Sequence, residues 1–508
     1  MFLPLNFDVT WPPRPKSWLL WILVLGVGWR ILRWVLRMPL WGDEVMLALN
    51  FLDRSGIELL EPLAMGQVAP PLFMLLHSWW MQVAGYSEWI LRLPSLLFGI
   101  VGLLLFSWFA MSSVRSSQAL IAVGILAVSF YAVRHGTEFK PYALDLAVSV
   151  GLLAVAQYFR IRSVSLRTTF SLLLATSLAT FCSYPSVFIS ASIITSLIVE
   201  AALMRDKRRL LAVGITAGLS GSSFVLSYLF IISPQAQTIS LLQGIWQHSF
   251  PPSGLFAFVG WVIEQSAGRM MAYPVGDQNY GSVLTLTLVC IGITHLLRHR
   301  LWFLIGILVL PFIFNISAAA LHLYPYGQRT GFAQHLVPSI CLLAGIGINS
   351  LVSLAKGKYK CHAYRWVLRL LVIVGIFGIA EVIARPYKSH GDLIPRYVIE
   401  KNIPDFGCAN LFVVNPLELV PVNFRWYLSI KENTQFGLNN FVDGLKSSDI
   451  LCVLHFDADR YEGESALLNK AVIKQRKEMQ LVSDKTEIAY IYGGKVHPHT
   501  FRLLVLKP

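Results

Sequence analysis

Two adjacent carboxylates, Asp43 and Glu44, follow the first strongly apolar segment of the chain, in the tetrapeptide Trp41-Gly42-Asp43-Glu44. Carboxylates are costly inside a bilayer and ordinary in water, so their place at the end of an apolar helix is informative. A pair located where a membrane helix meets the aqueous phase could do acid/base chemistry on a substrate that arrives from the lipid. Ordinary solvated loop charge is the simpler interpretation, and the surrounding elements decide between the two.

The composition is that of a protein that crosses a membrane many times. Hydrophobic residues make up 55% of the 508 residues and charged residues only 14%, whereas soluble domains carry about a quarter charged residues. The formal net charge of +14 could suggest nucleic acid, but the basic residues collect in short loops between apolar segments, as the positive-inside rule predicts. We therefore expect a lipid partner and no nucleic acid.

Eleven apolar segments are long enough to be transmembrane spans. They lie near residues 17–38, 93–113, 118–134, 141–159, 168–183, 186–204, 210–232, 282–297, 301–320, 332–354 and 366–384. With a cytoplasmic N-terminus, the inner loops hold sixteen Lys and Arg residues against two acids, which is the bias that sets orientation. The sequence thus predicts an all-α polytopic membrane domain over residues 1–384, located in the inner (plasma) membrane of the cell.

The apolar stretch 70–80 does not fit this set. As a helix it would be about 16 Å long, too short to cross a hydrocarbon core of about 30 Å. We expect it to lie in the membrane interface, anchored by Trp79 and Trp80, with a short tilted span as the alternative.

Residues 385–508 are more polar and contain short β-like runs at 411–414, 450–456, 488–492 and 501–506, with helical patterns between some of them. This pattern predicts a small α/β domain, which the topology places outside the cytoplasm. Cys408 and Cys452 each adjoin a predicted strand and could pair in an oxidising compartment, although spacing alone does not establish the geometry.

Charged residues also gather on the predicted outer face. Arg134, Glu138 and Lys140 lie in one outer turn, and further positions are Arg92, Asp145 and Arg329. Singly, each has a structural explanation: Glu138 and Lys140 could form a surface salt bridge, and Arg329 could anchor a helix end. Together, acids that can activate a hydroxyl and bases that can hold a phosphate lie on one side, as a transferase using a lipid phosphate requires.

Three arginines near the outer end of the first span, Arg30, Arg33 and Arg37, are spaced i, i+3 and i+7. This spacing predicts that they share one helix face, from which they could extend to lipid headgroups.

Five motifs in order resemble those of bacterial membrane glycosyltransferases with the GT-C fold, the relatives of protein O-mannosyltransferases and lipid A aminoarabinose transferases (glycosyltransferase family 39-like). The resemblance is strong over 17–160, reappears at 322–340, is weak over 205–300, and does not extend to 385–508. The matching segments are Trp41-Gly42-Asp43-Glu44, Ala69-Pro70-Pro71-Leu72-Phe73, Gly85-Tyr86-Ser87-Glu88 with Leu91-Arg92-Leu93-Pro94-Ser95, Glu138-Phe139-Lys140-Pro141-Tyr142, and Tyr324-Pro325-Tyr326-Gly327 with Arg329.

The resemblance implies a sugar donor linked to a polyprenyl phosphate, and a hydroxyl or amine acceptor on a protein, lipid or glycan. By match to the family, Asp43 is the expected base, and Glu44 positions it or contacts the sugar. Binding of the donor is expected from Lys140 and Arg329, then from Arg92, Arg134, Glu138, Tyr142 and Tyr326. Glu138 would orient Lys140 or contact the donor. No cofactor is required, although some relatives use a divalent metal near the first-loop carboxylates.

Two other function classes are compatible with a polytopic chain. A transporter or flippase of lipid-linked saccharides would place charges at mid-membrane within inverted repeats, whereas the ionisable residues here lie at the ends of spans. An inactive scaffold would present residues 385–508 to a partner. The presence of Asp43, Lys140 and Arg329 argues against the scaffold.

Overall fold

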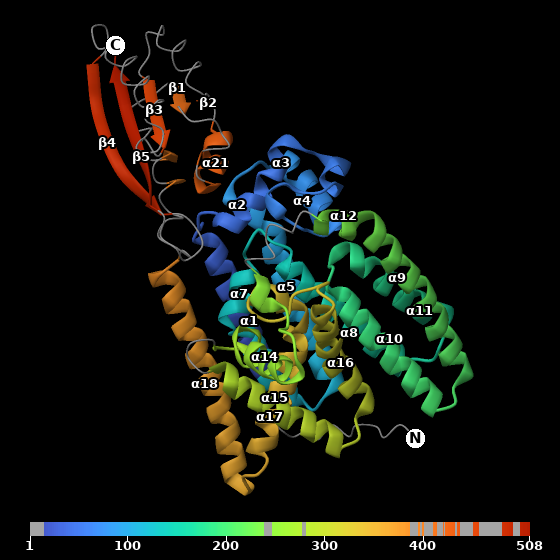
Figure 1. The fold of residues 1–508 in the computed structure, drawn as a ribbon. Coiled ribbons are helices and arrows are strands. Elements are labelled where there is room, and N and C mark those ends of the chain that lie inside the picture. Colours follow the sequence, from blue (N-terminus) through green and yellow to red (C-terminus); the bar gives the residue numbers. More distant parts are fainter. Residues whose placement is uncertain are drawn as a thin grey trace. The chain divides into compact units, whose positions relative to one another are not determined.

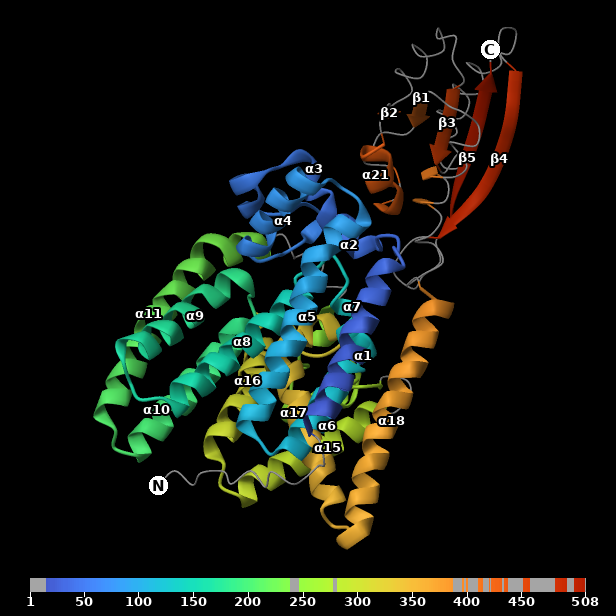
Figure 2. The ribbon, with the colours of Figure 1, turned by 180° about the vertical axis from the view of Figure 1, so that it is seen from behind.

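Long apolar helices form most of the described chain in this computed structural model (Figures 1 and 2). The structure describes residues 15–237, 246–276, 281–386, 395–396, 399–400, 410–413, 420, 422–431, 434–436, 451–456, 480–490 and 498–507. Within these ranges, nine helices are long and apolar enough to cross a membrane. They comprise α1 (Pro15–Val35), α5 (Glu88–Ser113), α8 (Tyr142–Ile161), α10 (Ser186–Leu203), α11 (Lys207–Ser227), α15 (Gly281–Arg298), α16 (Trp302–Ala320), α17 (Val337–Val352) and α18 (Gly357–Ala384).

Two shorter apolar helices, α6 (Ser116–Ala127) and α9 (Leu166–Cys182), correspond to the remaining predicted spans. The predicted all-α polytopic membrane fold is therefore confirmed, and the chain is an integral membrane protein. Shorter helices join the spans: α4 (Pro71–Ala84), α7 (Phe130–His135), α12 (Ser233–Gln237), α14 (Leu255–Ala267), and the single turns η1 (Gly56–Leu60), η2 (Ala64–Gly66), η3 (Tyr228–Ile232), η5 (Gln247–Ser249), η6 (Arg269–Met271) and η8 (Thr330–Leu336).

The predicted span at 118–134 is not one helix, because α6 ends at Ala127 and α7 begins at Phe130. A helix end leaves carbonyls without intrahelical partners, and these need other donors. Arg30 of α1 supplies them: its guanidinium donates to the Leu126 and Ala127 carbonyls, each at 3.4 Å. The prediction missed this break because the hydropathy stays high across it.

The predicted shared face of the three arginines is wrong. Helix α1 ends at Val35, and Arg37 lies beyond it with φ of 43°, in the left-handed region. Arg30 is fully buried and donates to carbonyls inside the fold, including that of Gly26 at 2.9 Å, so it does not extend to headgroups. Arg37 therefore does not share a helix face with Arg30 and Arg33.

Helices α8 and α17 are the most deeply buried of the long spans, and α17 packs against α15 and α6. Close approach at the α15–α17 contact depends on a missing side chain. A Cβ at Gly347 would lie 2.0 Å from the carbonyl oxygen of Leu288. Membrane helices associate through such small residues because lipid supplies no hydrophobic drive between helices.

Helix α4 matches the short apolar stretch that we expected outside the set of spans. Its 14 residues begin after Pro70, and Pro71 occupies the first turn, where a missing N–H is tolerated. Phe73, His77 and Met81 are buried at i, i+4 and i+8. Its place in the membrane interface stays a prediction.

The chain divides into two compact units, and each is described by itself. The first comprises Met1–Leu36 and Gly56–Ala384, and the second Arg37–Ser55 and Arg385–Pro508. The second unit thus includes α2 (Gly42–Ala48) and α3 (Asn50–Asp53), which follow the first span in sequence. The predicted domain boundary at 384/385 stays a proposal.

The C-terminal part of the second unit is α/β, as predicted. A five-stranded sheet has the order β2-β1-β3-β5-β4, in which β1 pairs parallel with β2 and β3, and β5 pairs antiparallel with β3 and β4. The elements are β1 (Asn410–Val413), α21 (Val422–Ser429), β2 (Thr434–Phe436), β3 (Leu451–Phe456), β4 (Gln480–Tyr490) and β5 (Pro498–Lys507). Strand β2 was not predicted. Cys408 and the side chain of Cys452 lie outside the described residues, so their pairing stays a prediction.

Candidate active site

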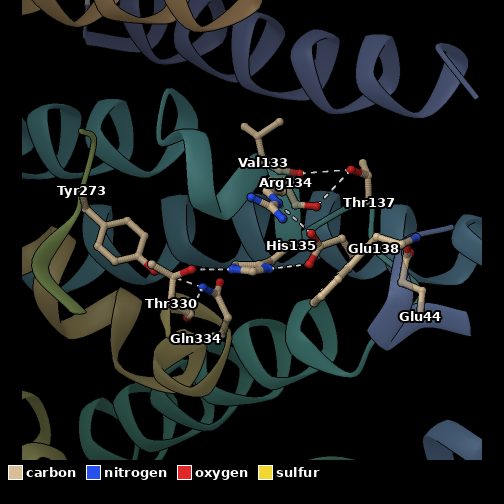
Figure 3. A network of polar contacts seen from close by, with 10 residues as sticks. Glu44, Val133, Arg134, His135, Thr137, Glu138, Tyr273, Thr330 and Gln334 are labelled. Atoms are coloured by element: carbon tan, nitrogen blue, oxygen red, sulfur yellow. Dashed lines mark hydrogen bonds and ion pairs between the residues drawn. The ribbon is translucent and has the colours of Figure 1, made fainter. Parts of the chain in front are cut away.

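Residues of α7 and of the turn between α7 and α8 form a network of polar contacts (Figure 3). Glu138 uses both carboxylate oxygens: Arg134 Nε donates to Oε1 and His135 Nδ1 lies against Oε2, each at 2.7 Å. Glu138 is only 3% exposed. A carboxylate with two charged or polar side-chain partners is held in one position, and a buried network of this kind is rigid when its members are satisfied.

His135 extends the network to a distant segment of the chain. Its Nε2 lies 2.7 Å from the hydroxyl oxygen of Thr330, at the start of η8 (Figure 3). With a proton on Nδ1, the neutral imidazole donates to Glu138 and accepts from Thr330. Thr330 directly follows Arg329, so the network fixes the backbone that carries this half-buried guanidinium.

Two further contacts hold the same segment. Gln334 donates through Nε2 to the Thr330 carbonyl at 2.9 Å and to the Tyr273 hydroxyl at 3.0 Å. The ring of Tyr142 lies edge-on to His135 and packs on Gly331, where a Cβ would come within 2.6 Å of the ring. Gly331 is therefore required for the close approach of Tyr142 to η8.

Lys140 is fixed by a different partner. Its ammonium donates to Gln67 Oε1 at 2.6 Å, and both side chains are buried. Glu138 and Lys140 are both buried, so they do not form a salt bridge at the surface. Lys140 thus reaches the segment before α4, while Glu138 faces α7.

Aromatic side chains of α4 pack against the turn between α7 and α8. Phe139 packs against two α4 side chains, with its ring centre 5.9 Å from that of Phe73 and 5.0 Å from that of His77. Burial lowers the pKa of His77 to about 4, although its hydrogen bond to the Phe73 carbonyl acts in the opposite direction. His77 is therefore neutral near pH 7 and serves as a packing residue.

Tyr326 is held by hydrogen bonds to residues of the first unit. Its hydroxyl bonds with Ser266 Oγ at 2.9 Å, and its backbone N–H donates to the Ser249 carbonyl at 3.0 Å. Burial raises the pKa of Tyr326 to about 12, so the phenol keeps its proton. Arg92, on α5, is also buried. The geometry of Tyr326 is that of a residue that holds the 324–329 loop in place.

In the second unit, Asp43 and Glu44 occupy the first turn of α2. Glu44 is fully buried, and its Oε2 accepts from the backbone N–H of Trp41 at 3.2 Å, three residues earlier. This is the reach-back of a capping box, and it fixes the start of the helix. Asp43 is half-buried beside it. Glu44 thus has the geometry of a support for Asp43.

The sequence did not identify His135, Thr330, Gln67 and Gln334 as parts of the site. His135 lies beside Arg134 in the same predicted turn as Glu138, and this position was the signal that could have identified it. Across the described residues, no group of three or more His, Cys, Asp or Glu side chains is arranged to hold a metal ion.

The chain is similar to known proteins in fold but not in sequence. No protein-family model matches the chain, and no curated protein sequence matches it. Crystal structures of ArnT from Cupriavidus metallidurans, in the apo state and bound to undecaprenyl phosphate, superpose with TM-scores of 0.53 and 0.52, at 13% identity, over 96% of this chain and 98% of theirs.

A third solved structure extends the comparison. The apo oligosaccharyltransferase of Archaeoglobus fulgidus has a TM-score of 0.50 at 14% identity, and the match covers 82% of this chain and 64% of that one. All three are GT-C structures, so the chain has the GT-C fold of membrane glycosyltransferases. At these identities the likeness shows the fold alone, and a shared fold does not imply a shared reaction.

Proposed function

We propose that the chain is an inverting glycosyltransferase that moves a hexosyl or pentosyl unit from a polyprenyl-phosphate-linked donor to an acceptor on the outer face of the plasma membrane. The observation that carries the proposal is the similarity to ArnT over nearly the whole of both chains, in a structure that binds undecaprenyl phosphate. The basic loops of the sequence support a cytoplasmic N-terminus and an extracytoplasmic C-terminal domain.

The phosphate end of the donor is assigned to Lys140 and Arg329, with Arg92 and Arg134 as further cations. A departing polyprenyl phosphate is already a stable anion, so it needs fixed positive charge and no strong acid. Lys140 is buried and hydrogen-bonded, and Arg329 adjoins the residue that His135 holds. Glu138 fixes Arg134 and His135 in this interpretation, which makes it a positioning residue.

Asp43 is assigned as the general base. The acceptor oxygen or nitrogen attacks the anomeric carbon, its proton passes to Asp43, and the bond from that carbon to the phosphate oxygen breaks with its electron pair on the phosphate. One direct displacement inverts the anomeric centre. The half-buried carboxylate, beside a helix start that Glu44 caps, fits a group that must be both accessible and oriented.

The test uses the full-length protein in lipid nanodiscs, undecaprenyl-phosphate-linked sugars, and native membranes as the source of acceptor. Asp43→Asn should lower release of undecaprenyl phosphate by at least about 100-fold, the usual contribution of a general base. The matched control is Asp53→Asn, an exposed aspartate of the same loop, which should turn over normally. Wild-type turnover of Asp43→Asn would exclude Asp43 as the base.

A second experiment tests whether Lys140 binds the phosphate of the donor. Lys140→Met should raise the donor KM by about 10- to 100-fold, since charge-assisted hydrogen bonds to phosphate contribute about 1.5–3 kcal/mol. Lys358→Met, at an exposed lysine, is the control. If the wild type in sealed liposomes moves undecaprenyl-phosphate sugars across the bilayer without any transfer, the transporter alternative replaces this proposal.

A further inference from the structure

The loop that follows α1, Arg37–Ser55, belongs with the C-terminal domain in the structure. Residues Arg37–Ser55 form one compact unit with Arg385–Pro508, apart from the helices that precede and follow the loop in sequence. Helix α2, which carries Asp43, contacts α21 of the C-terminal part. The loop with the assigned base is therefore packed within the same unit as a domain that the motif resemblance does not reach.

A hydrogen bond joins the two at the residue before the motif. The backbone N–H of Leu40 donates to the phenolic oxygen of Tyr427 at 3.0 Å. Leu40 is fully buried and Tyr427 is 4% exposed, so water does not replace the phenol when it is lost. A buried N–H without an acceptor is strongly unfavourable.

Helix α21 is built to hold that tyrosine rigidly. Phe424, Tyr427 and Leu428 stand at i, i+3 and i+4, which places them on one face, and all three are buried together with Trp426. Four buried side chains on an eight-residue helix anchor it firmly in its unit. Tyr427 is thus a fixed acceptor.

A second attachment holds the beginning of the loop. Glu400 accepts from Arg37 Nη2 at 3.0 Å, and Arg396 donates through Nη1 to the Arg37 carbonyl. Arg396 also pairs with Glu400, at 3.6 Å. Both the side chain and the backbone of Arg37 are therefore bound to the C-terminal part, at the left-handed residue where the chain turns out of α1.

The two attachments converge on the start of α2. Consecutive N–H groups are fixed there, that of Leu40 by Tyr427 and that of Trp41 by Glu44. We propose that the C-terminal domain is the positioning element of the proposed base: through Tyr427, Arg396 and Glu400 it sets the first turn of α2 and so the direction of the Asp43 carboxylate. This inference rests on the proposed function, and Tyr427 is its central positioning residue.

The experiment measures loop order separately from turnover. Hydrogen–deuterium exchange of the full-length chain in nanodiscs is followed in the peptide covering residues 38–48, for wild type and Tyr427→Phe. The phenylalanine keeps the ring and removes the acceptor, so amide exchange in this peptide should rise about tenfold. Tyr359→Phe, at an exposed tyrosine, should leave it unchanged.

Kinetic measurements then distinguish a loss of Asp43 positioning from a general loss of structure. In Tyr427→Phe the kcat should fall about tenfold, while the donor KM and the binding of undecaprenyl phosphate itself stay at wild-type values. A merely structural role would instead loosen β3 and β5 as much as residues 38–48, and that result would overturn the proposal. Unchanged exchange at 38–48 would overturn it as well.

A milder variant covers the case in which Tyr427→Phe fails to fold. Arg396 is half-buried, so Arg396→Gln should be tolerated and should raise exchange about two- to threefold at residues 37–41, with β3 and β5 unchanged. No change at 37–41 would count against the proposal. If Asp43→Asn turns over normally while Tyr427→Phe still loosens the loop, the assigned base fails and the attachment of the loop stands.

Discussion

Glu138 and Glu44 are both buried glutamates, but their carboxylates are held in different ways. Glu138 accepts from two side chains, and one of these, His135, continues to Thr330, 195 positions away in the chain. Glu44 accepts from the backbone of Trp41, three positions away, at the start of its own helix. The first arrangement joins remote segments, and the second orders a local turn. A change at Glu138 should therefore affect more distant parts of the chain than a change at Glu44.

The largest effect should come from Glu138→Ala. It leaves Arg134 and His135 facing a buried space without their acceptor, and removing one member of a buried charge pair typically costs about 3–5 kcal/mol. We expect the free energy of unfolding to fall by about that amount, and turnover to be lost with it. Chemical denaturation in detergent measures the first effect.

Glu264→Ala is the matched control for that variant, because Glu264 is an exposed glutamate on α14. Its free energy of unfolding should stay within about 0.5 kcal/mol of wild type. If Glu138→Ala lowers the free energy of unfolding by less than about 1 kcal/mol, the network does not stabilise the contact between the Glu138 turn and the segment of Thr330.

A smaller effect is expected from acid, through His77. The pKa of this imidazole is lowered by burial to about 4, from about 6.5 in the unfolded chain. As the pH falls below 6.5, His77 becomes protonated in the unfolded chain but stays neutral in the folded protein. The free energy of unfolding therefore has its full value above pH 6.5 and declines as the pH falls towards 4. Over that window the free energy of unfolding should drop by about 3 kcal/mol.

His77→Gln cannot be protonated, so the variant should lack this part of the pH dependence. Denaturation curves at pH 7 and pH 4.5 measure it: the stability difference between wild type and variant should narrow on acidification. Parallel curves for the two proteins would show that His77 does not titrate in this window.

The smallest effect should come from Glu400→Gln in the second unit. Glu400 also has two arginine partners, a hydrogen bond from Arg37 and an ion pair with Arg396, but its side chain is 43% exposed. Water screens such pairs, so the free energy of unfolding should change by less than about 1 kcal/mol. A loss as large as that of Glu138→Ala would show that burial does not explain the difference between Glu138 and Glu400.

The sequence was sufficient for features that depend on periodicity and spacing. All eleven predicted spans have a counterpart among the described helices, because a membrane helix is specified by its own apolar length. The capping contact of Glu44 is equally local, since positions i and i+3 meet at any helix start.

Features that depend on tertiary contact could not be predicted. The break between α6 and α7 relies on an arginine from another helix, and hydropathy does not register it. The contact of His135 with Thr330 joins residues that no pattern links. The attachment of Leu40 to Tyr427 depends on the folding of a domain that carries no recognised motif. In each case one side chain meets a distant backbone or hydroxyl, and sequence spacing contains no record of it.

Arg30 has a further consequence for how mutations in this chain will behave. Because its guanidinium closes the end of α6, the length of the third span is determined partly by a residue of the first. Replacing Arg30 by leucine would make α1 more lipid-like by any hydropathy scale. It would also leave two carbonyls of α6 facing apolar surroundings, which favours continuation of the helix through Val128 and Ser129. A substitution that favours membrane insertion of α1 would thus lengthen α6 and disturb the turn that follows it.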